Sequence, residues 1–343
     1  MATVKPHPVT GGTADAAGSS PAALAVPAAM RSSAIAVSGL RKAYGDKIVL
    51  DGIDLDVQAG TVFSLLGPNG AGKTTTVNVL TTLIKADSGT VRVAGHDVAT
   101  EARHVRAAIG VTGQFAAVDD LLTGEENLQL MADLHHLRVG EGRRVVISLL
   151  ERFDLAESAQ KLVSTYSGGM RRKLDLAMTL VTRPQIIFLD EPTTGLDPRS
   201  RRTMWDIVRE LVADGVTIFL TTQYLEEADQ LADQIAVLDQ GHLVAQGTPG
   251  ELKRQVPGSH VQFRFTDVAA LDAAARILPG STRDDEALTL RVPGNGGTKP
   301  LRDLLDRLDE HSIEAEDLSV HTPDLDDVFL ALTGHPSTEA IAP

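Results

Sequence analysis

A run of glycines followed by lysine and threonine is the part of the sequence best suited to chemistry. Its residues are Gly67, Pro68, Asn69, Gly70, Ala71, Gly72, Lys73 and Thr74. Glycines let backbone N–H groups turn toward an anion without a Cβ clash. A helix that begins at Lys73 would add the positive end of its dipole and unpaired N–H groups. The segment therefore predicts a cradle for the phosphates of a nucleotide.

The side chains of this cradle would have separate tasks. Lys73 would place a positive charge at the β- and γ-phosphates, Thr74 would offer a hydroxyl to Mg²⁺, and Thr75 would bind a phosphate oxygen. A random chain of this length shows the pattern on the order of 1% of the time when glycine makes up about 7% of residues. This copy also follows the apolar segment Thr61–Leu66 and precedes a helical pattern, which is the context that the motif requires.

Two adjacent acids, Asp190 and Glu191, end the apolar run Ile186–Leu189. A strand of this kind beside the strand that enters the glycine loop would place both acids near the γ-phosphate. Successive side chains of a strand point in opposite directions, so the acids should differ in task. Asp190 would hold Mg²⁺, directly or through water, and Glu191 would polarise the attacking water. The alternative is an acidic helix start before Pro192.

The elements that position these residues alternate between strand and helix patterns. Such alternation predicts a parallel sheet covered by helices on both faces, with the mostly helical stretch 101–182 inserted into it. The expected strands are Ile35–Val37, Ile53–Val57, Thr61–Leu66, Ile186–Leu189, Thr217–Leu220 and Ile235–Leu238. The expected helices around them are Lys73–Ile84, Arg199–Ala213 and Leu225–Ala232.

The two ends of the chain differ from its middle. Residues 1–33 are rich in Ala, Pro, Gly and Ser, and we expect a disordered tail there because such a stretch buries too little apolar area. After residue 247 the composition becomes acidic. Strand patterns at Val261–Phe265, Ala287–Val292 and Ile313–Val320 and helix patterns at Ala269–Ile277, Leu301–Leu308 and Leu325–Leu332 predict a small α+β domain.

Composition excludes several classes of function. The chain has 343 residues, no cysteine and a net charge of −14. The absence of cysteine excludes disulfides, thiolate zinc sites and cysteine nucleophiles. The acidic charge and an aromatic content of 3% argue against binding to nucleic acid. No apolar run approaches the ~20 residues that span a bilayer, so any work on a membrane would need another chain.

The segment Tyr166-Ser167-Gly168-Gly169-Met170 places its serine 23 residues before Asp190. Alone, the segment is explained equally well as a helix N-cap with a flexible turn that has no part in binding. Together with the glycine loop, Asp190-Glu191, Gln114 and the Gly195-Leu196-Asp197 turn, it resembles the ATP-binding cassette (ABC) family over residues 35–247. The resemblance makes the glycine loop the Walker A motif, the acidic strand end Walker B and the serine-glycine segment the signature.

The resemblance implies an α/β fold, namely a P-loop NTPase of the ABC nucleotide-binding type. It would have a mixed sheet flanked by helices and a helical subdomain at about 115–182. The domain would cover 34–247, with a C-terminal accessory or regulatory α+β domain over 248–335 and a short tail at 336–343.

Further residue roles follow from the resemblance. Tyr44 would stack on adenine, unless it is only a turn tyrosine. Gln114 would touch Mg²⁺ or the attacking water and would link the core to the helical subdomain. Ser167, Gly168 and Gly169 would contact the γ-phosphate bound to a second copy, and Asp197 would lie at the seam of this homodimer. Two ATP molecules would be held between Walker A of one copy and the signature of the other.

The sequence departs from the family pattern at two places. Tyr166 and Met170 flank the signature where leucine and glutamine are usual, although the serine and glycines are kept. Gln223 stands where the family usually has a switch histidine, and a glutamine amide cannot carry a proton near neutral pH. Hydrolysis should therefore depend on Glu191 and on the positioning of water. Gln223 and the tail 323–335 are similar to the daunorubicin-resistance type within the family.

The resemblance implies the ATPase subunit of a bacterial exporter, which would use ATP and Mg²⁺ to move drugs or other hydrophobic compounds. It would be peripheral to the cytoplasmic face of the membrane, bound to an integral membrane permease that contacts the transported compound. No nucleic acid is expected as a partner. The alternatives are a soluble ABC ATPase that acts on ribosomes or DNA, and a P-loop kinase outside the family.

Other polar residues are expected to have only structural tasks. His135 and His136 should be surface imidazoles, because the histidines show no convincing metal-ligand spacing. Trp205 should serve in packing. The basic runs Arg171-Arg172-Lys173 and Arg201-Arg202 should be solvated helix faces rather than contacts with a membrane partner.

Overall fold

The computed structural model describes residues 32–114, 116–256, 258–294, 298–321 and 323–334. The tails expected at 1–33 and 336–343 lie outside these ranges, except for Ser32 and Ser33, and Ser33 already begins the first strand. Among the described residues, the search for a membrane-spanning helix finds none of sufficient length and apolar character.

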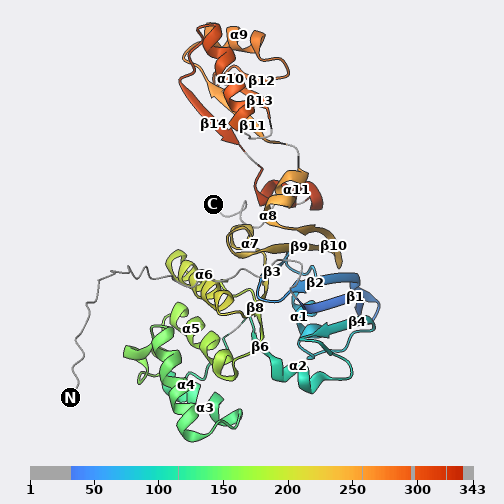
Figure 1. Ribbon diagram of the computed structural model, residues 1–343, viewed down its shortest axis with the longest axis vertical. Coiled ribbons are helices and arrows are strands. Elements are labelled where there is room, and N and C mark those ends of the chain that lie inside the picture. The colour runs from blue at the N-terminus through green and yellow to red at the C-terminus, as the bar shows by residue number, and fades with distance from the viewer. Residues whose placement is uncertain (1–31, 115, 257, 295–297, 322, 335–343) are drawn as a thin grey trace, which may run out of the picture. The chain divides into compact units, whose positions relative to one another are not determined.

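A six-stranded sheet with the order β10-β9-β3-β8-β7-β6 forms the centre of the fold (Figure 1). All neighbouring strands are parallel except β9 and β10, so the sheet is mixed. Every residue of β3, β7 and β8 is buried, as expected of strands covered on both faces. The strands are β3 (Val62–Leu66), β6 (Ile109–Thr112), β7 (Ile186–Asp190), β8 (Thr217–Thr222), β9 (Gln234–Asp239) and β10 (His242–Gly247).

A second, antiparallel sheet has the order β2-β1-β4-β5. Its strands are β1 (Ser33–Tyr44), β2 (Lys47–Gln58), β4 (Ser88–Val93) and β5 (His96–Asp97). The first two lie where the sequence predicts strands but are longer, and they meet at the expected turn after Tyr44. Strands β4 and β5 were not predicted, because four of the six residues of β4 are exposed and apolar alternation is too short to indicate a strand there.

Helices cover the central sheet. They are α1 (Lys73–Leu80), α2 (Ala102–Ala108), α6 (Pro198–Ala213) and α7 (Leu225–Leu231). Helix α1 is shorter than the predicted range to Ile84, because the backbone turns into the left-handed region at Thr82, with φ of 65°. Its central apolar side chains Val77, Val79 and Leu80 are almost fully buried, and they join the core between the two sheets.

The stretch after β6 is helical, as predicted, and contains α3 (Gly124–Leu134), α4 (Val139–Arg152), α5 (Gly168–Thr179) and the short 3-10 turns η2 (Ala156–Ser158), η3 (Val163–Thr165) and η4 (Leu180–Thr182). Thr123 and Glu126 form a capping box that begins α3. Leu128, Phe153 and Leu174 are buried in one core that extends to β7 and β8. Strand β6 lies within the range 101–182 and was missed, because its four residues give little periodicity.

A four-stranded antiparallel sheet of order β12-β13-β11-β14 forms the small α+β domain. Its elements are β11 (His260–Arg264), α9 (Val268–Ile277), β12 (Thr282–Asp284), β13 (Thr289–Pro293), α10 (Thr298–Glu310) and β14 (Asp317–His321). Phe263, Phe265, Leu271 and Leu290 are almost fully buried in its own core. This domain contains the three strands and the two helices expected here from the sequence, although β12 was not predicted and β14 begins later than Ile313.

Two further helices share a core with the larger domain. They are α8 (Pro249–Gln255), which was not predicted, and α11 (Leu325–Thr333). Leu325, Val328 and Phe329 of α11 pack with Leu252 of α8 and Leu225 of α7. Asp324 caps α11 and forms a capping box with Asp327. The acidic helix near the end of the chain therefore buries its apolar face against α7 and α8.

The packing of α11 can be tested with two neighbouring side chains. Phe329 is 5% exposed, whereas Leu330 is 50% exposed. We expect Phe329→Ala to lower the free energy of unfolding by about 3–5 kcal/mol, as for other buried aromatic side chains. The control Leu330→Ala should change it by less than about 1 kcal/mol. Urea unfolding followed by the fluorescence of the single tryptophan, Trp205, measures both. Equal effects of the two variants would contradict this packing.

Candidate nucleotide-binding site

The predicted site residues come from strand ends at one edge of the central sheet. The register pairs Leu66 with Thr222 and Asp190 with Thr221. Carboxyl ends of parallel strands meet at the same edge, so the glycine loop, Glu191 and Gln223 all begin there. Strand β6 ends at Thr112, opposite Leu189, and brings Gln114 to this edge as well. Ligands of open α/β sheets bind at such edges.

The glycine loop is closely packed against its surroundings. A Cβ atom on Gly67 would lie 2.2 Å from the Leu238 carbonyl oxygen. Gly72 has φ of 113°, and a Cβ atom there would lie 2.7 Å from Leu50 Cδ2. Gly72 is also the N-cap of α1 and offers no side chain to the first N–H groups of that helix. The loop therefore leaves these donors available to an anion.

Lys73 is buried at the centre of the site, with 4% of its surface exposed. Its ammonium donates to the Gly67 carbonyl at 2.7 Å and to the Pro68 carbonyl at 3.2 Å. It also forms an ion pair of 3.2 Å with Glu191 Oε1. Burial lowers the pKa of Lys73, while the Glu191 carboxylate opposes this shift. The side chain thus connects the glycine loop to the end of β7.

Thr74 and Asp190 form the second contact between α1 and β7. The Thr74 hydroxyl donates to Asp190 Oδ2 at 3.0 Å, and the Thr221 hydroxyl donates to Asp190 Oδ1. Mg²⁺ binds oxygen ligands at 2.0–2.1 Å in an octahedron, in which adjacent ligands lie about 2.9 Å apart. A hydroxyl and a carboxylate oxygen at this separation fit a magnesium ion.

Glu191 has a backbone conformation that is uncommon for a residue with a side chain, with φ of 50°. Its N–H donates to the Thr221 carbonyl at 3.1 Å, which holds the residue against β8. Its Oε1 faces Lys73, and its Oε2 accepts from Thr194 at 3.4 Å. The two acids of the strand end therefore have different partners, since the Asp190 side chain accepts from two hydroxyls, whereas Glu191 pairs with an ammonium and accepts from one hydroxyl.

Four other predicted residues have fewer contacts in the structure. Gln223 is partly buried, and its Oε1 has no hydrogen-bond partner among the described residues. Gln114 is exposed and follows Gly113 after β6. Tyr44 is 52% exposed, and the Lys42 ammonium lies 5.5 Å from its ring centre. Thr75 is partly buried in the first turn of α1. The roles of these residues stay predictions.

The signature begins α5. The Ser167 hydroxyl accepts from the Met170 N–H at 3.2 Å and is the N-cap of the helix. Ser167 and Gly168 are exposed, and Gly169 is partly buried. A Cβ atom on Gly169 would lie 2.6 Å from Ser200 Oγ. The start of α5 therefore lies against the start of α6, where Asp197 accepts from the N–H groups of Arg199 and Ser200 as N-cap.

Tyr166 explains one departure from the family pattern. It is buried, and its hydroxyl donates to the Ser158 carbonyl at 2.7 Å. A Cβ atom on Gly124 would lie 2.3 Å from that hydroxyl, so the glycine makes room for the larger ring. The aromatic side chain thus supports the signature from the core of the helical subdomain.

The sequence analysis missed Arg172, which was expected on a solvated face and is 6% exposed. Its guanidinium donates to the Pro192 carbonyl at 2.8 Å and the Gly113 carbonyl at 2.7 Å. It also forms an ion pair of 3.3 Å with Asp175. The opposite charges three residues apart were the only signal in the sequence. The prediction of a solvated face was wrong, because this face of α5 packs against β7 and the end of β6.

Arg201 is also less exposed to solvent than the sequence predicts. Only 23% of its side chain is exposed. Its guanidinium lies 5.1 Å from the ring centre of Tyr224 and 3.7 Å from Glu226. Arg201 therefore joins α6 to the start of α7, directly after Gln223, and this basic run is only partly in solvent.

Trp205 is buried, as expected of a packing residue, and it also has a polar partner. Its indole N–H donates to Glu227 Oε1 at 3.2 Å. Glu227 is fully buried, and desolvation raises its pKa despite this hydrogen bond and the nearby Arg201. Glu227 was not predicted, since nothing in the sequence distinguishes it from its exposed neighbour Glu226. His135 and His136 are exposed, as expected.

A strand, a glycine loop, a lysine that begins a helix and an acidic end on a neighbouring strand define a P-loop nucleotide-binding domain. Residues 50–194 match the ABC transporter family. The chain is 52% identical to the daunorubicin resistance ATP-binding protein DrrA3 of Streptomyces coeruleorubidus, over 89% of this chain and 97% of that relative. This chain therefore belongs to the family of ABC transporter ATP-binding proteins, and it is an ABC-type ATPase.

Two more comparisons agree with this family. The Nod factor export ATP-binding protein I of Burkholderia orbicola is 39% identical over 86% of this chain and 95% of that relative. A solved ATP-binding subunit of an ABC transporter superposes with a TM-score of 0.58 at 28% identity, over 64% of this chain and 92% of that one. The predicted family and fold class are confirmed.

The burial of the Glu227 carboxyl predicts how the free energy of unfolding depends on pH. Below the ordinary pKa of glutamic acid both folded and unfolded chains hold the proton; above it only the unfolded chain ionises freely, so stability falls as pH rises. Glu227→Gln removes this loss. Relative to wild type, we expect its unfolding free energy to rise between about pH 5 and pH 8, by up to about 1.4 kcal/mol per pH unit.

Urea unfolding at several pH values, followed by Trp205 fluorescence, measures this difference at the indole that contacts Glu227. The control is Glu226→Gln, because the Glu226 side chain is 59% exposed. Its difference from wild type should vary much less with pH. A Glu227→Gln difference that stays constant over this range would show that the carboxyl does not stay protonated on folding.

Proposed function

We propose that the chain is the ATPase subunit of a bacterial drug exporter, which uses ATP hydrolysis to drive efflux of daunorubicin-like or other hydrophobic compounds through a separate permease. The observation that carries the ATPase part is the meeting of Lys73, Thr74, Asp190 and Glu191 at one sheet edge. The relatives named for daunorubicin resistance and for Nod factor export support an export role.

In this proposal the loop residues hold the nucleotide phosphates. The backbone of residues 67–72 and the first turn of α1 supply N–H donors, Lys73 supplies a positive charge, and Thr75 supplies a hydroxyl. Lys73 exchanges its contact with Glu191 for a phosphate oxygen, which frees the Glu191 carboxylate to accept a proton from water. Tyr44, which is exposed, stacks on the adenine ring.

Magnesium completes the nucleotide site. Thr74, Asp190 and Gln114 offer the oxygen atoms that would hold it, and the ion would neutralise phosphate charge that develops in phosphoryl transfer. Gln223 donates its amide N–H to the γ-phosphate region, where a titratable side chain is usual in the family. The proton of the attacking water therefore goes to Glu191.

A second copy of the chain supplies the other half of the site. Among the described residues, the hydrogen bonds and ion pairs of Ser167 and Asp197 are local to the starts of α5 and α6, and none joins them to the glycine loop. Exposed Ser167 and Gly168 at the start of a helix can bind a phosphate of a partner. We place Gly169 and Asp197 at the same dimer seam.

The permease would contact the transported compound, and the ATPase would bind it at the cytoplasmic face of the membrane. Closure of the dimer on ATP would move the helical subdomain, to which Arg172 joins the Gly113 carbonyl and the end of β7. The alternative of a soluble ABC ATPase on ribosomes or DNA is not favoured, because relatives alike over most of their length are named for resistance or export.

The variant Glu191→Gln tests this proposal. It keeps the side-chain shape and removes the base, so we expect a loss in kcat of about 10²–10⁴-fold. The variant should still bind Mg-ATP and accumulate as a dimer in light scattering. Vesicles that contain the chain and its permease should take up doxorubicin with wild type and not with the variant. The control Glu210→Gln, at an exposed position of α6, should hydrolyse and transport like wild type.

A second substitution separates dimer formation from nucleotide binding. Ser167→Asp keeps an N-cap acceptor but places a carboxylate where a phosphate of the partner should lie. In the Glu191→Gln background, this change should leave ATP bound to a monomer. A dimer that forms equally well would contradict the signature contact. Full hydrolysis without any doxorubicin uptake would leave the ATPase and contradict the export role.

Gln223 gives a separate prediction about the rate. If its amide donates to a charged phosphate, Gln223→Ala should lower kcat by about ten- to a hundredfold, because such hydrogen bonds contribute about 1.5–3 kcal/mol. Gln223→His should retain activity and add a pH step near a pKa of about 6.5. Gln230→Ala, at an exposed position of α7, is the control. Hydrolysis by Gln223→Ala at the wild-type rate would exclude a role for this side chain.

A further inference from the structure

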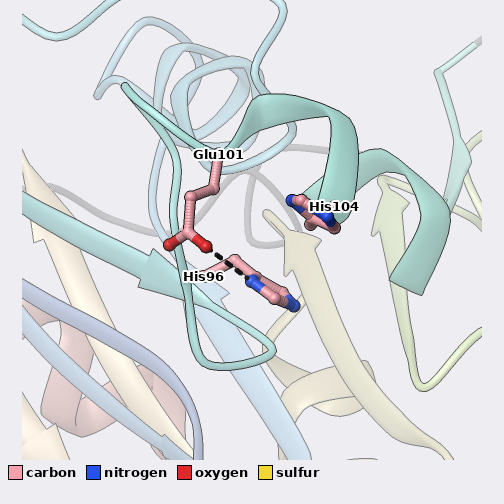
Figure 2. A group of neighbouring side chains, drawn as sticks. All are labelled: His96, Glu101 and His104. Atoms are coloured by element: carbon pink, nitrogen blue, oxygen red, sulfur yellow. Dashed lines mark hydrogen bonds and ion pairs between the residues drawn. The ribbon is translucent and has the colours of Figure 1, made fainter.

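Two histidines and a glutamate, none of them part of the predicted nucleotide site, gather in one place, as Figure 2 shows. His96 lies in β5, Glu101 is the N-cap of α2, and His104 lies in the first turn of that helix. The ligand atoms that these three side chains offer all lie within 4.8 Å of one another. The spacing in sequence gave no sign of this cluster, because a hairpin and a loop bring His96 back to α2.

The distances suit a small ion. His96 Nδ1 lies 3.1 Å from Glu101 Oε1. Two ligands bound to a tetrahedral zinc ion at about 2.0–2.1 Å are separated by about 3.3 Å. The rings of His96 and His104 lie face to face with centres 5.0 Å apart. His104 is exposed, so rotation of its side chain can bring a ring nitrogen closer to the other two ligand atoms.

The backbone around the cluster is held in place before any ion binds. Glu101 Oε2 accepts from the Asp97 N–H at 2.9 Å, and Asp97 Oδ1 accepts from the N–H groups of Ala99 and Thr100. The Glu101 N–H donates to the Asp97 carbonyl at 2.8 Å. These bonds fix the loop between His96 and Glu101, so little chain entropy is lost when the ligands converge.

The charges near the cluster include both signs. Hydrogen bonds from the Asp97 N–H and from His96 lower the pKa of Glu101. Arg92 on β4 weakens attraction for a cation, but its guanidinium donates to the Gly95 carbonyl. Asp97 adds a second negative charge beside Glu101. The donor set of two imidazoles and one carboxylate is typical of zinc and related divalent metals.

We propose that His96, Glu101 and His104 form a binding site for one divalent transition-metal ion of the zinc class. The ion would join the β4–β5 hairpin to the start of α2. Helix α2 continues directly into β6, which ends two residues before Gln114. Metal binding would therefore stabilise the segment that carries Gln114 to the edge of the nucleotide site. The remaining coordination positions would be filled by water.

The test uses the full chain without an affinity tag, stripped of metal and free of nucleotide. Zn²⁺ is titrated in competition with a chromophoric chelator. We expect wild type to bind one more Zn²⁺ per chain than the double variant His96→Ala/His104→Ala. Glu101→Gln should weaken this site at least tenfold. Zn²⁺ should also raise the thermal midpoint of wild type and not that of the double variant.

The control is His135→Ala/His136→Ala, which removes two exposed histidines from another helix end. It should bind Zn²⁺ like wild type. In chelator, circular dichroism and the thermal midpoint of the double variant should match wild type, because its changed side chains are partly or fully exposed. Equal binding by wild type and the double variant would overturn the proposal. An equal loss in the control would do so as well.

Discussion

The nucleotide site depends on one buried cation. The Lys73 ammonium is withdrawn from water, and its carbonyl and Glu191 contacts provide the compensation that a buried charge requires. Loss of either charge would leave the other buried and unpaired, which costs about 3–5 kcal/mol in other proteins. The same contacts join the loop after β3 to the end of β7. In the proposed mechanism, a phosphate that replaces Glu191 beside Lys73 would change the partners of both segments at once, which would couple nucleotide binding to the position of the proposed base.

A second buried cation, Arg172, connects the signature helix to that same strand end. Its guanidinium reaches carbonyls that precede Gln114 and follow Glu191, and five N–H donors in a fixed plane suit several acceptors better than an ammonium does. Asp175 accompanies it in the core, where burial raises the pKa of the carboxyl and Arg172 opposes the shift. Because the start of α5 also lies against α6 at Gly169 and Ser200, the signature is in contact with both the end of β7 and the Asp197 turn.

The sequence could predict the parts of the site that are formed by consecutive residues. The glycine loop, the acids after Ile186–Leu189 and the N-caps Ser167 and Asp197 are local patterns, and local backbone chemistry places them. Arg172, Glu227 and the His96 cluster could not be predicted, because charged residues on a helix appear solvated until the packing of other segments is known. Short strands such as β5 and β6 were missed for the related reason that their pairing partners, not their own periodicity, define them.

The end of β8 has the opposite electrostatic character from the loop after β3. There ionisation is disfavoured: burial raises the pKa of Glu227, and Gln223 stands where the family usually has a titratable side chain. Arg201 of α6 lies over the ring of Tyr224 and pairs with Glu226. These two contacts attach the start of α7 to α6. Gln223 directly precedes Tyr224, and its unpaired Oε1 favours a hydrogen-bond donor that arrives with nucleotide or water. In the proposed mechanism proton transfer is left to Glu191, because the Gln223 amide cannot carry a proton near neutral pH.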